Sequence, residues 1–342
     1  MKETMNVPVF TGNGTITFQN RPIPLPQKPE DVLVRLNLSG ICGTDLNILA
    51  IPPLHNATPN IIIGHEGVGV VEMTGTAVTS LKPGDRVVIA PRLTCGKCRF
   101  CRRGLDNQCE NYTSVGTSRD GTFSPYICVP ASALYQISSS VSQEDAVLFE
   151  PLSCVVGSLA RSPVFPGENV AVIGSGPIGM LFAMLCRLQG AGKVILVGRS
   201  PYRLNIAREV GVTTIINPEE CDLSAEVHRL TEIGCDMVID AVGNQLPVAT
   251  NLTRRGGRII LFGMRKLDNP AVNQYTITRN DLSIFGTFVG LKPFIPTIKL
   301  LESNLIHPSA IITHHVPLAN LMDGIALMRN RQAMKVIVDC EA

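Results

Sequence analysis

A short apolar strand, a glycine-rich turn and an apolar helix follow one another directly in residues 169–190. The run NVAVI has the composition of a buried strand, and the next segment, GSGPIG, has the spacing GxGxxG. Glycines at these positions allow a tight turn and a close approach of the backbone, while the N-terminus of the following helix attracts a pyrophosphate group. Because strand, turn and helix occur together, we expect a dinucleotide-binding unit rather than glycines that only reverse the chain. The turn residues are Gly174, Gly176, Pro177, Ile178 and Gly179.

Strand and helix patterns alternate through residues 155–286, which we expect to form one domain. The apolar run KVILVG at 193–198 is followed by Ser200 as a helix N-cap and by Pro201 at the first helical position. Alternation of this kind builds a doubly wound parallel sheet, the Rossmann arrangement, and places the chain in the α/β class. Further strand candidates lie at 214–217, 237–242 and 258–263.

Short strand patterns separated by turn residues fill the N-terminal half of the chain. In the segment VLVRLNL at 32–38, Val32 and Val34 alternate with Arg35 and Asn37 in a period of two, which predicts an antiparallel strand with one polar face. The chain returns to mixed character after residue 286. We therefore expect residues 1–154 and 287–342 to form a second domain that is β-rich and barrel-like.

Composition and charge exclude several classes of protein. Apolar residues make up 45% and charged residues 17% of the 342 residues, which is typical of a compact folded chain. The formal charge of +2 indicates neither nucleic acid nor a membrane surface as a partner, so we expect a small-molecule ligand. The sequence contains no signal peptide and no run of about 18 apolar residues, and we expect a cytoplasmic protein. In that reducing compartment the 11 cysteines should be thiols or metal ligands.

Four cysteines crowd into the segment PRLTCGKCRFCRRGLDNQC. Their spacing is C-x2-C-x2-C-x7-C, which brings four soft thiolates onto one loop. Four thiolates fill a tetrahedral shell and leave no position for water, so we predict a structural zinc site. Reduced surface thiols and an iron–sulfur cluster are the alternatives. The predicted ligands are Cys95, Cys98, Cys101 and Cys109.

A second set of metal-binding side chains is spread more widely along the chain. Cys42 lies in the segment GICGTD, His65 in the segment GHE, and Glu150 in the segment LFEPLSC. One thiolate, one imidazole and one carboxylate match the three-ligand pattern of a catalytic zinc with one exchangeable position. We therefore predict two zinc ions per chain, one structural and one catalytic.

The order and spacing of these motifs resemble the medium-chain zinc-containing alcohol dehydrogenases, especially the sorbitol, polyol and threonine dehydrogenase branch. The resemblance extends over essentially the whole chain, and it implies a GroES-like barrel beside the Rossmann domain and a homodimer or homotetramer. It also implies hydride transfer between a nicotinamide cofactor and a secondary alcohol of a polyol, sugar acid or related polar substrate, the product being the ketone. A threonine-type amino-alcohol dehydrogenase and a non-catalytic, cofactor-binding relative are the alternatives.

The resemblance also implies roles for the metal-site residues. Cys42, His65 and Glu150 would be the catalytic zinc ligands, and Glu66 takes the position of a second carboxylate that approaches the metal or holds its water. Cys154 lies four residues after Glu150, so on a helix it would share the same face and is a competing ligand.

Proton transfer is where this chain departs from its relatives. By the resemblance, Thr44 supplies the hydroxyl that contacts the substrate oxygen, and Asp45 orients the ligating histidine. Many relatives carry a histidine two residues after this aspartate, whereas this chain has Asn47, whose amide cannot act as a base near neutral pH. His55, in the loop IPPLHNATPN, is either a replacement for that histidine or a solvated loop residue.

The end of the second strand of the Rossmann domain indicates which cofactor is used. NAD-preferring relatives place an acid there, but this chain has Gly198, Arg199 and Ser200. Nothing in this segment repels a 2′-phosphate, and a guanidinium and a hydroxyl are present to bind one. We therefore expect NADP(H) to be favoured over NAD(H), with Arg203, one helical turn further on, adding to the site.

Other cofactor contacts are implied by the resemblance alone. They lie at strand ends that border the nicotinamide, except for a lysine in the segment AMKVIV that would lie near the pyrophosphate. These residues are Val242, Gly243, Gly263, Met264, Thr287, Phe288 and Lys335.

Overall fold

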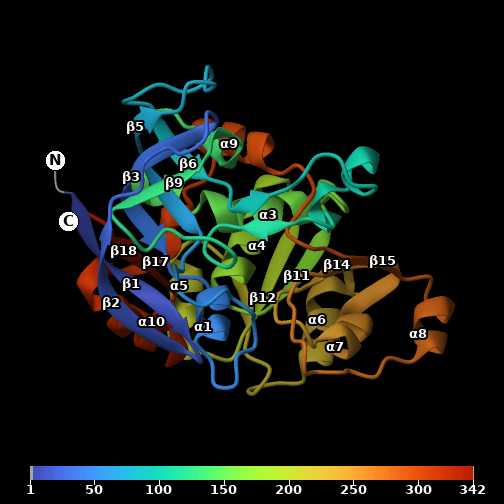
Figure 1. The fold of residues 1–342 in the computed structure, drawn as a ribbon. Helices are drawn as coiled ribbons and strands as arrows, with labels where there is room; N and C mark the ends of the chain where they lie inside the picture. Colours follow the sequence, from blue (N-terminus) through green and yellow to red (C-terminus); the bar gives the residue numbers. More distant parts are fainter. Residues whose placement is uncertain (1–2, 342) are drawn as a thin grey trace. The chain divides into compact units, whose positions relative to one another are not determined.

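The computed structural model describes residues 3–341, which separate into two compact units (Figure 1). Unit 1 contains the chain up to Pro151 and again from Phe294 onward, and unit 2 contains Leu152–Pro293. No helix within residues 3–341 is both long enough and apolar enough to span a bilayer.

Unit 2, which lies wholly within the described residues, contains a six-stranded sheet whose neighbouring strands are all parallel. The strand order β13-β12-β11-β14-β15-β16 reverses at β11, the strand that precedes the glycine-rich turn. This order confirms the predicted doubly wound α/β class. The strands are β11 (Asn169–Ile173), β12 (Lys193–Val197), β13 (Thr214–Ile216), β14 (Cys235–Asp240), β15 (Thr253–Leu261) and β16 (Ser283–Gly286), and the helices are α4 (Pro177–Leu188), α5 (Pro201–Glu209), α6 (Leu223–Thr231), α7 (Leu246–Leu252) and α8 (Gln274–Arg279).

The central strands of unit 2 are covered on both faces. Val170, Ala171 and Val172 are consecutive in β11 and point alternately to opposite faces of the sheet, yet all three are fully buried. Burial on both faces explains why these strands are continuous apolar runs in the sequence rather than alternating patterns.

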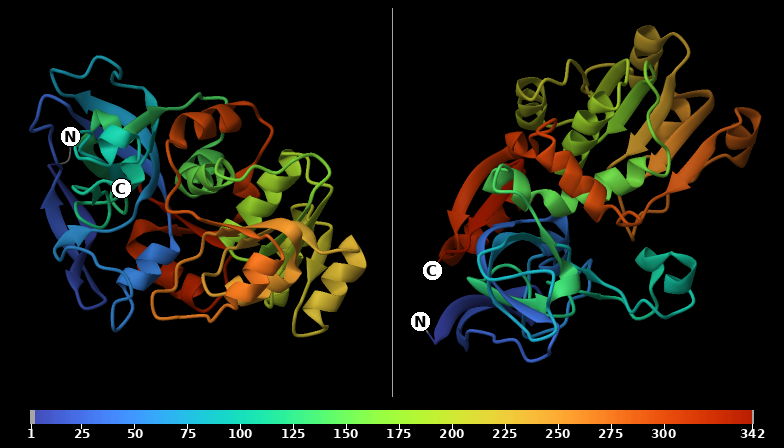
Figure 2. Two further views of the ribbon diagram at one scale, coloured as in Figure 1. Left: turned by 90° about the vertical axis from the view of Figure 1, so that its right-hand side faces the viewer. Right: turned by 90° about the horizontal axis from the view of Figure 1, so that it is seen from above.

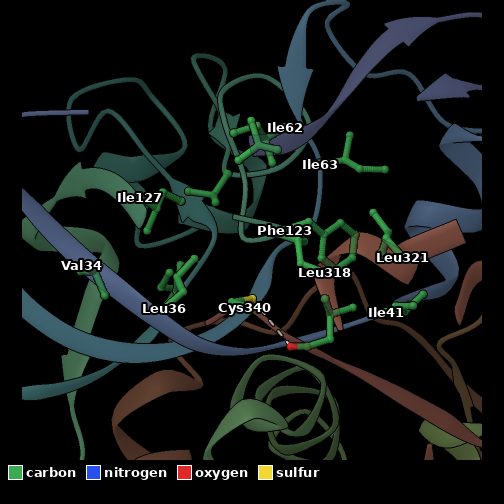
Figure 3. Close-up of a cluster of buried hydrophobic side chains, with 14 of the residues drawn as sticks. Val34, Leu36, Ile41, Ile62, Ile63, Phe123, Ile127, Leu318, Leu321 and Cys340 are labelled. Atoms are coloured by element: carbon green, nitrogen blue, oxygen red, sulfur yellow. Dashed lines mark hydrogen bonds between the residues drawn. The ribbon is translucent and has the colours of Figure 1, made fainter. Parts of the chain in front are cut away.

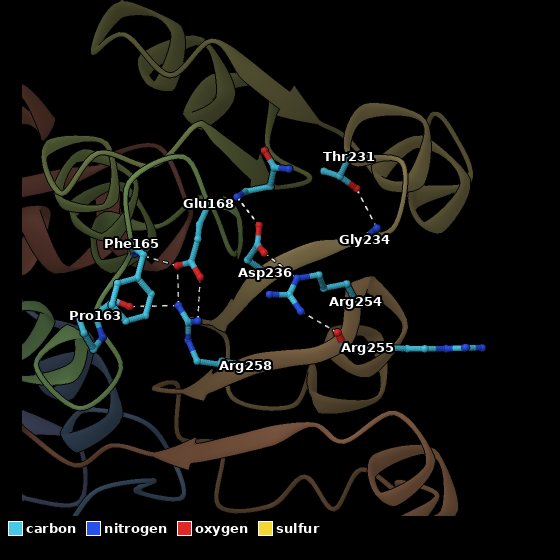
Figure 4. Close-up of polar contacts among 10 residues, drawn as sticks. Pro163, Phe165, Glu168, Thr231, Gly234, Asp236, Arg254, Arg255 and Arg258 are labelled. Carbon is cyan, nitrogen blue, oxygen red and sulfur yellow. Dashed lines mark hydrogen bonds and ion pairs between the residues drawn. The ribbon is translucent and has the colours of Figure 1, made fainter.

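Ion pairs connect residues near the N-terminal ends of the central strands of unit 2 (Figure 4). Arg258 of β15 donates to both carboxylate oxygens of Glu168, at 2.8 and 2.6 Å. Arg254 donates to Asp236 of β14 at 2.6 Å, and the same carboxylate accepts the backbone N–H of Asn169 at 2.8 Å. These contacts fix β11, β14 and β15 at the ends opposite the glycine-rich turn.

Within the described part of unit 1, seven strands form one sheet in the order β10-β6-β5-β3-β18-β17, with β9 paired to β3, and three form the sheet β2-β1-β4. Neighbours in these sheets are antiparallel except β17 and β18, which are parallel. The strands are β1 (Thr4–Gly12), β2 (Thr15–Pro22), β3 (Asp31–Gly40), β4 (Ile61–Ile62), β5 (Glu66–Thr74), β6 (Arg86–Ile89), β9 (Tyr126–Pro130), β10 (Leu134–Gln136), β17 (Ile312–Pro317) and β18 (Lys335–Asp339), and the helices are α1 (Gly43–Ile48), α2 (Gln143–Val147), α9 (Phe294–Glu302) and α10 (Leu321–Arg329).

The core of unit 1 combines segments from both ends of the chain (Figure 3). Val34 and Leu36 of β3 are fully buried in the same cluster as Ile62 of β4, Phe123 and Leu321 of α10. The C-terminal segment therefore completes a core that the first 150 or so residues begin.

The segment that carries the four cysteines projects from unit 1 as a small lobe (Figure 2). Two short strands, β7 (Arg92–Leu93) and β8 (Thr113–Ser114), pair antiparallel and close the base of this lobe. Between them lie two single turns of 3-10 helix, Cys101–Arg103 and Asp106–Gln108.

The prediction of a polar face on strand 32–38 is wrong. β3 pairs with β5, β9 and β18, so it lies in the interior of the sheet, and Leu33 and Asn37 on its supposed polar face are buried. The polar side chains are accommodated by partners: Arg35 donates to Glu72 at 2.7 Å, and Asn37 donates to Glu341 at 3.1 Å.

The compact units divide the chain a few residues away from the predicted domain boundaries. Residues 152–154 and 287–293 belong to unit 2, whereas the sequence suggested that they belong to the other domain. The reason is α3 (Phe149–Leu159), whose C-terminal half is tied to the segment after β16. Ser158 donates to Thr287 at 3.0 Å, and Gly157 packs closely on Gly290.

Candidate functional site

Three metal-binding side chains of unit 1 converge where β3 and β5 pair. Gly40, at the end of β3, is opposite Glu66, the first residue of β5. This register brings Cys42, two residues after β3, beside His65, the residue before β5. The donor atoms of Cys42, His65 and Glu66 all lie within 4.8 Å of one another.

Buried polar atoms without partners mark the same place. Among the described residues, Asp45 Oδ1, His65 Nδ1 and Glu66 Oε1 are buried and make no hydrogen bond. Asp45 Oδ1 and His65 Nδ1 face each other at 3.9 Å, so Glu66 Oε1 is the atom of this set that remains available to a ligand. A thiolate, an imidazole and a carboxylate are donors that suit zinc, and these residues therefore fit the predicted metal.

The charges around His65 are also those of a cation site. Burial alone would lower the pKa of His65, but the charges of Cys42, Asp45 and Glu150 outweigh it and raise that pKa well above its usual range. Asp45 Oδ1 lies 3.9 Å from His65 Nδ1, on the side expected for a carboxylate that orients the ring.

Glu66, rather than Glu150, completes the observed group of three donors. Glu150 of α3 lies outside the group, although its charge acts on His65. A ligand role for Glu150 stays a prediction, and so does the competing role of Cys154, a residue of unit 2.

Lys335, which the sequence analysis expected near the cofactor pyrophosphate, lies beside Glu66. Lys335, in β18, is only 2% exposed, and its ammonium donates to Glu66 Oε2 and to the carbonyl oxygen of Ile41, the latter at 2.9 Å. Burial lowers the pKa of Lys335, but the charges of Glu66 and Cys42 outweigh this effect, so the pKa is raised above its usual value. The lysine in the otherwise apolar run AMKVIV was the signal of a buried, paired charge. Its predicted contact with the cofactor pyrophosphate stays a prediction.

The candidate proton-transfer residues lie on α1 and in the loop that follows it. The hydroxyl of Thr44 is 3.8 Å from the Cys42 sulfur. The carbonyl oxygen of Asn47 accepts the backbone N–H groups of Leu54, at 3.0 Å, and His55, at 3.3 Å. The loop therefore returns His55 to the neighbourhood of Asn47.

The four cysteines of the lobe form a compact group of sulfur atoms. All four lie within 4.8 Å of one another, and none is in a disulfide. Backbone N–H groups donate to three of them: Cys98 N to Cys95 at 3.3 Å, Cys101 N to Cys98 at 3.5 Å, and Cys95 N to Cys109 at 3.4 Å. Donors directed at sulfur favour thiolates, the form that binds zinc.

Asn111 is a partner of this group that the sequence reading missed. Its side-chain amide donates to Cys95 at 3.6 Å, and this contact, with backbone N–H groups, lowers the pKa of Cys95 to about 6. Burial and the neighbouring thiols raise the pKa of Cys101 to about 12. Asn111 lies two residues beyond the last cysteine, where a side-chain donor could have been expected.

The glycine-rich turn of unit 2 has the geometry that the motif predicts. Gly174 has a φ of 116°, in the region that favours glycine, and its N–H donates to Val197 at 2.8 Å. A Cβ atom on Gly179 would collide with the carbonyl oxygen of Gly174. Gly176 is the N-cap of α4, so the first N–H groups of that helix face the turn.

The residues predicted to select the cofactor lie after β12. Ser200 caps α5 and accepts the backbone N–H of Arg203 at 3.4 Å. The guanidinium of Arg203 lies beside the turn, with Nη1 3.7 Å from the place that a Cβ on Gly176 would take. Gly198 and Arg199 follow β12 directly.

Asp240 organises the strand ends that were expected to border the nicotinamide. Its carboxylate accepts the N–H groups of Val242, Gly243 and Gln245, each at 2.8 Å. A Cβ on Gly243 would lie 2.7 Å from the carbonyl carbon of Gly263, so these two loops touch through backbone atoms.

The side chains in this region differ in exposure. Thr287 is buried and donates to Leu261 at 3.1 Å, whereas Met264 and Phe288 are exposed. Cofactor contacts of Val242, Gly263, Met264, Thr287 and Phe288 stay predictions.

Two protein families match this chain. Residues 28–139 match the alcohol dehydrogenase GroES-like domain, and residues 177–303 match the zinc-binding dehydrogenase family. Sorbitol dehydrogenase of Bacillus subtilis is 30% identical over 98% of this chain and 97% of its own length. L-Threonine 3-dehydrogenase of Vibrio parahaemolyticus is 34% identical over 92% of this chain and 94% of its own. A solved structure, described as a zinc-binding dehydrogenase of Sinorhizobium meliloti bound to NADP, is 30% identical, has a TM-score of 0.93, and covers 99% of this chain and 100% of its own.

The Glu66–Lys335 pair leads to a prediction about stability. Replacing Lys335→Met leaves a buried carboxylate without its cation, so we expect a loss of about 3–5 kcal/mol in the free energy of unfolding of chelator-treated protein. Glu66→Gln in the same chain should restore most of that loss. Urea denaturation of the two variants and the wild type measures both effects.

Lys299→Met is the matched control, because Lys299 is exposed on α9 of the same unit. It should leave the denaturation midpoint unchanged. A Lys335→Met protein as stable as wild type, or a double variant less stable than Lys335→Met, would contradict the assignment.

Proposed function

This chain belongs to the zinc-containing medium-chain alcohol dehydrogenases, and we propose that it interconverts a secondary alcohol and a ketone in a polyol, sugar acid or related polar compound. The observation that carries the proposal is the group of Cys42, His65 and Glu66 with the unpartnered, buried Oε1 of Glu66. Relatives named as sorbitol dehydrogenase, D-xylulose reductase and D-arabinitol dehydrogenase support the substrate class. A homodimer or homotetramer stays a prediction.

In this proposal, different residues of unit 1 bind the metal and transfer the proton. Cys42, His65 and Glu66 would hold the catalytic zinc, with Glu150 as a further carboxylate. A bound zinc ion polarises the substrate oxygen and lowers the pKa of its hydroxyl, and a bound nicotinamide accepts the hydride. The Thr44 hydroxyl, close to Cys42, would accept the proton of a substrate hydroxyl held there while it releases its own proton to the next acceptor of a relay.

A substrate panel tests the proposed function. It should contain polyols, aldonates, L-threonine and simple secondary alcohols, each assayed with NADP and NAD on protein of measured zinc content. We expect the highest kcat/KM with a polyol or aldonate. The highest value with L-threonine would favour the threonine-type alternative. No turnover at full zinc content, together with tight cofactor binding, would favour a non-catalytic relative.

We propose two zinc ions per chain with separate roles, and single variants distinguish them. Cys42→Ala should lose one zinc and lower kcat at least about 10³-fold while the melting temperature changes little, because the open site does chemistry. Cys95→Ala should lose the other zinc and lower the melting temperature, because the closed site holds a loop together. Metal analysis and thermal denaturation measure these effects.

Cys221→Ala is the control for the zinc variants, since Cys221 is exposed and belongs to neither group. It should keep both metals and full activity. If Cys42→Ala retained two zinc ions, the proposed catalytic site would be wrong.

We propose that NADP(H) is preferred because Arg199 and Ser200 can bind a 2′-phosphate. Removing one charged hydrogen-bond donor costs about 1.5–3 kcal/mol, so Arg199→Ala should raise the KM for NADP about 10- to 100-fold and hardly change that for NAD. Arg208→Ala, on the exposed side of α5, is the control. Equal changes for both cofactors, or a wild-type enzyme that prefers NAD, would contradict the proposal.

We propose that His55 replaces the base that Asn47 cannot supply. Its Nδ1 faces the carbonyl oxygen of Asn56 at 2.9 Å, and because a carbonyl only accepts, Nδ1 carries the proton. The Nε2 of a neutral ring is then left to accept one. The backbone N–H of His55 donates to the carbonyl oxygen of Asn47, which holds this exposed residue next to α1 and supports the role.

His55→Ala should lower kcat about 10²-fold at neutral pH, the low end of what a positioned base contributes, with a smaller loss at high pH. Adding Asn47→His to this variant should restore activity. His228→Ala, on α6 of unit 2, is the control. An unchanged pH–rate profile in His55→Ala would rule the role out.

A further inference from the structure

Two buried hydroxyl groups meet beside the metal-binding group of unit 1. Ser39 of β3 and Thr122 are both fully buried, and their side-chain oxygens lie 2.6 Å apart, so one hydroxyl donates to the other. Ser39 lies three residues before Cys42, and the residue of β5 opposite it is Gly67. The hydroxyl pair therefore lies one step along the strands from the position where the metal-binding side chains converge.

Thr122 contacts the chain on both sides of His65 and Glu66. Its N–H donates to the carbonyl oxygen of Gly64 at 2.9 Å, and its hydroxyl oxygen would be 2.9 Å from a Cβ on that glycine. Its methyl group would be 2.8 Å from a Cβ on Gly67. Gly64 has a φ of 94°, a conformation that favours glycine. A movement of Thr122 would therefore shift the backbone before His65 and after Glu66.

The hydrogen bond between the two hydroxyls does more than fill space. Replacing both partners of a buried hydrogen bond by apolar groups of the same shape is usually nearly neutral for stability, so packing alone does not require hydroxyls here. A hydrogen bond differs from an apolar contact because it prefers one distance and one direction. The Ser39–Thr122 bond thus holds the strand that leads to Cys42 at a defined separation from the segment that contacts Gly64.

We propose that Ser39 and Thr122 are positioning residues for the catalytic metal. They bring the backbone that carries Cys42 and the backbone that carries His65 into a fixed relation, although neither belongs to the group of metal-binding side chains. Residues that orient metal ligands in this indirect way typically change metal affinity about 10- to 100-fold. The inference rests on the proposed catalytic zinc.

Zinc affinity tests the positioning role. Thr122→Val should weaken zinc binding at the Cys42 site about 10-fold, whereas Thr122→Ser, which keeps the hydroxyl, should bind zinc like the wild type. Competition with a chelator measures this affinity, and the relevant zinc ion is the one that Cys42→Ala lacks. Unchanged affinity in Thr122→Val would overturn the inference alone. A wild-type protein that holds no zinc outside the four-cysteine lobe would refute the proposed catalytic site and this role together.

A stability comparison separates positioning from a merely structural bond. In the Cys42→Ala background, where this zinc does not contribute, Thr122→Val should lower the melting temperature by about 2–6 °C, because the Ser39 hydroxyl loses its partner. Adding Ser39→Ala should recover most of that loss. With Cys42 present, Ser39→Ala/Thr122→Val should still bind zinc about 10-fold more weakly than the wild type. Recovery of zinc affinity together with stability would overturn the inference.

Thr253→Val is the matched control. The Thr253 hydroxyl, in unit 2, is also buried and donates to the carbonyl oxygen of Ala249 at 2.7 Å. Its removal should lower the melting temperature and leave the zinc affinity unchanged. A similar loss of zinc affinity in this variant would overturn the inference, because destabilisation alone would then explain the effect at Thr122.

Discussion

The register between β3 and β5 is the constraint on which the metal site of unit 1 depends. It sets Gly40 opposite Glu66, so that the residues just beyond the end of one strand and just before the start of the other share one buried place. Cys42 and His65 meet there although 22 residues separate them in the chain. A slip by one residue would turn Glu66 to the other face of the sheet and separate the donors. The position of the site therefore depends on this strand pairing.

In unit 2, the order of the strands determines where the candidate ligand-binding edge of the sheet lies. The reversal of strand order at β11 leaves the glycine-rich turn at the carboxyl ends of the strands, where parallel sheets bind ligands. Asp240, at the end of the adjacent strand β14, ties three N–H groups into one loop. Close backbone contacts at Gly179 and Gly243 then leave little freedom to the loops around the turn.

Features encoded within a short segment could be predicted from the sequence, and features created by distant pairing could not. The glycine-rich turn and the four-cysteine spacing are each encoded within one short segment. Gly174 therefore has the expected turn conformation, and Cys95 lies with the other three cysteines of the lobe. The salt bridge of Lys335 to Glu66 joins residues 269 positions apart, and nothing in either segment alone specifies the partner. The polar face expected of β3 was wrong because a strand pattern does not tell whether neighbours cover both faces.

The positions of the two metal-binding groups along the chain imply an order of maturation. The cysteine lobe is closed by its own short strands and by donors within residues 95–111, all of which leave the ribosome early in synthesis. The group around Cys42 includes Lys335, from the last strand, so its charge is balanced only when the chain is complete. The four cysteines of the lobe can thus come together before the last strand is made, whereas the charges around Cys42 are balanced only afterwards. Loss of the final strand would therefore remove buried core residues of unit 1 together with the cation beside Glu66.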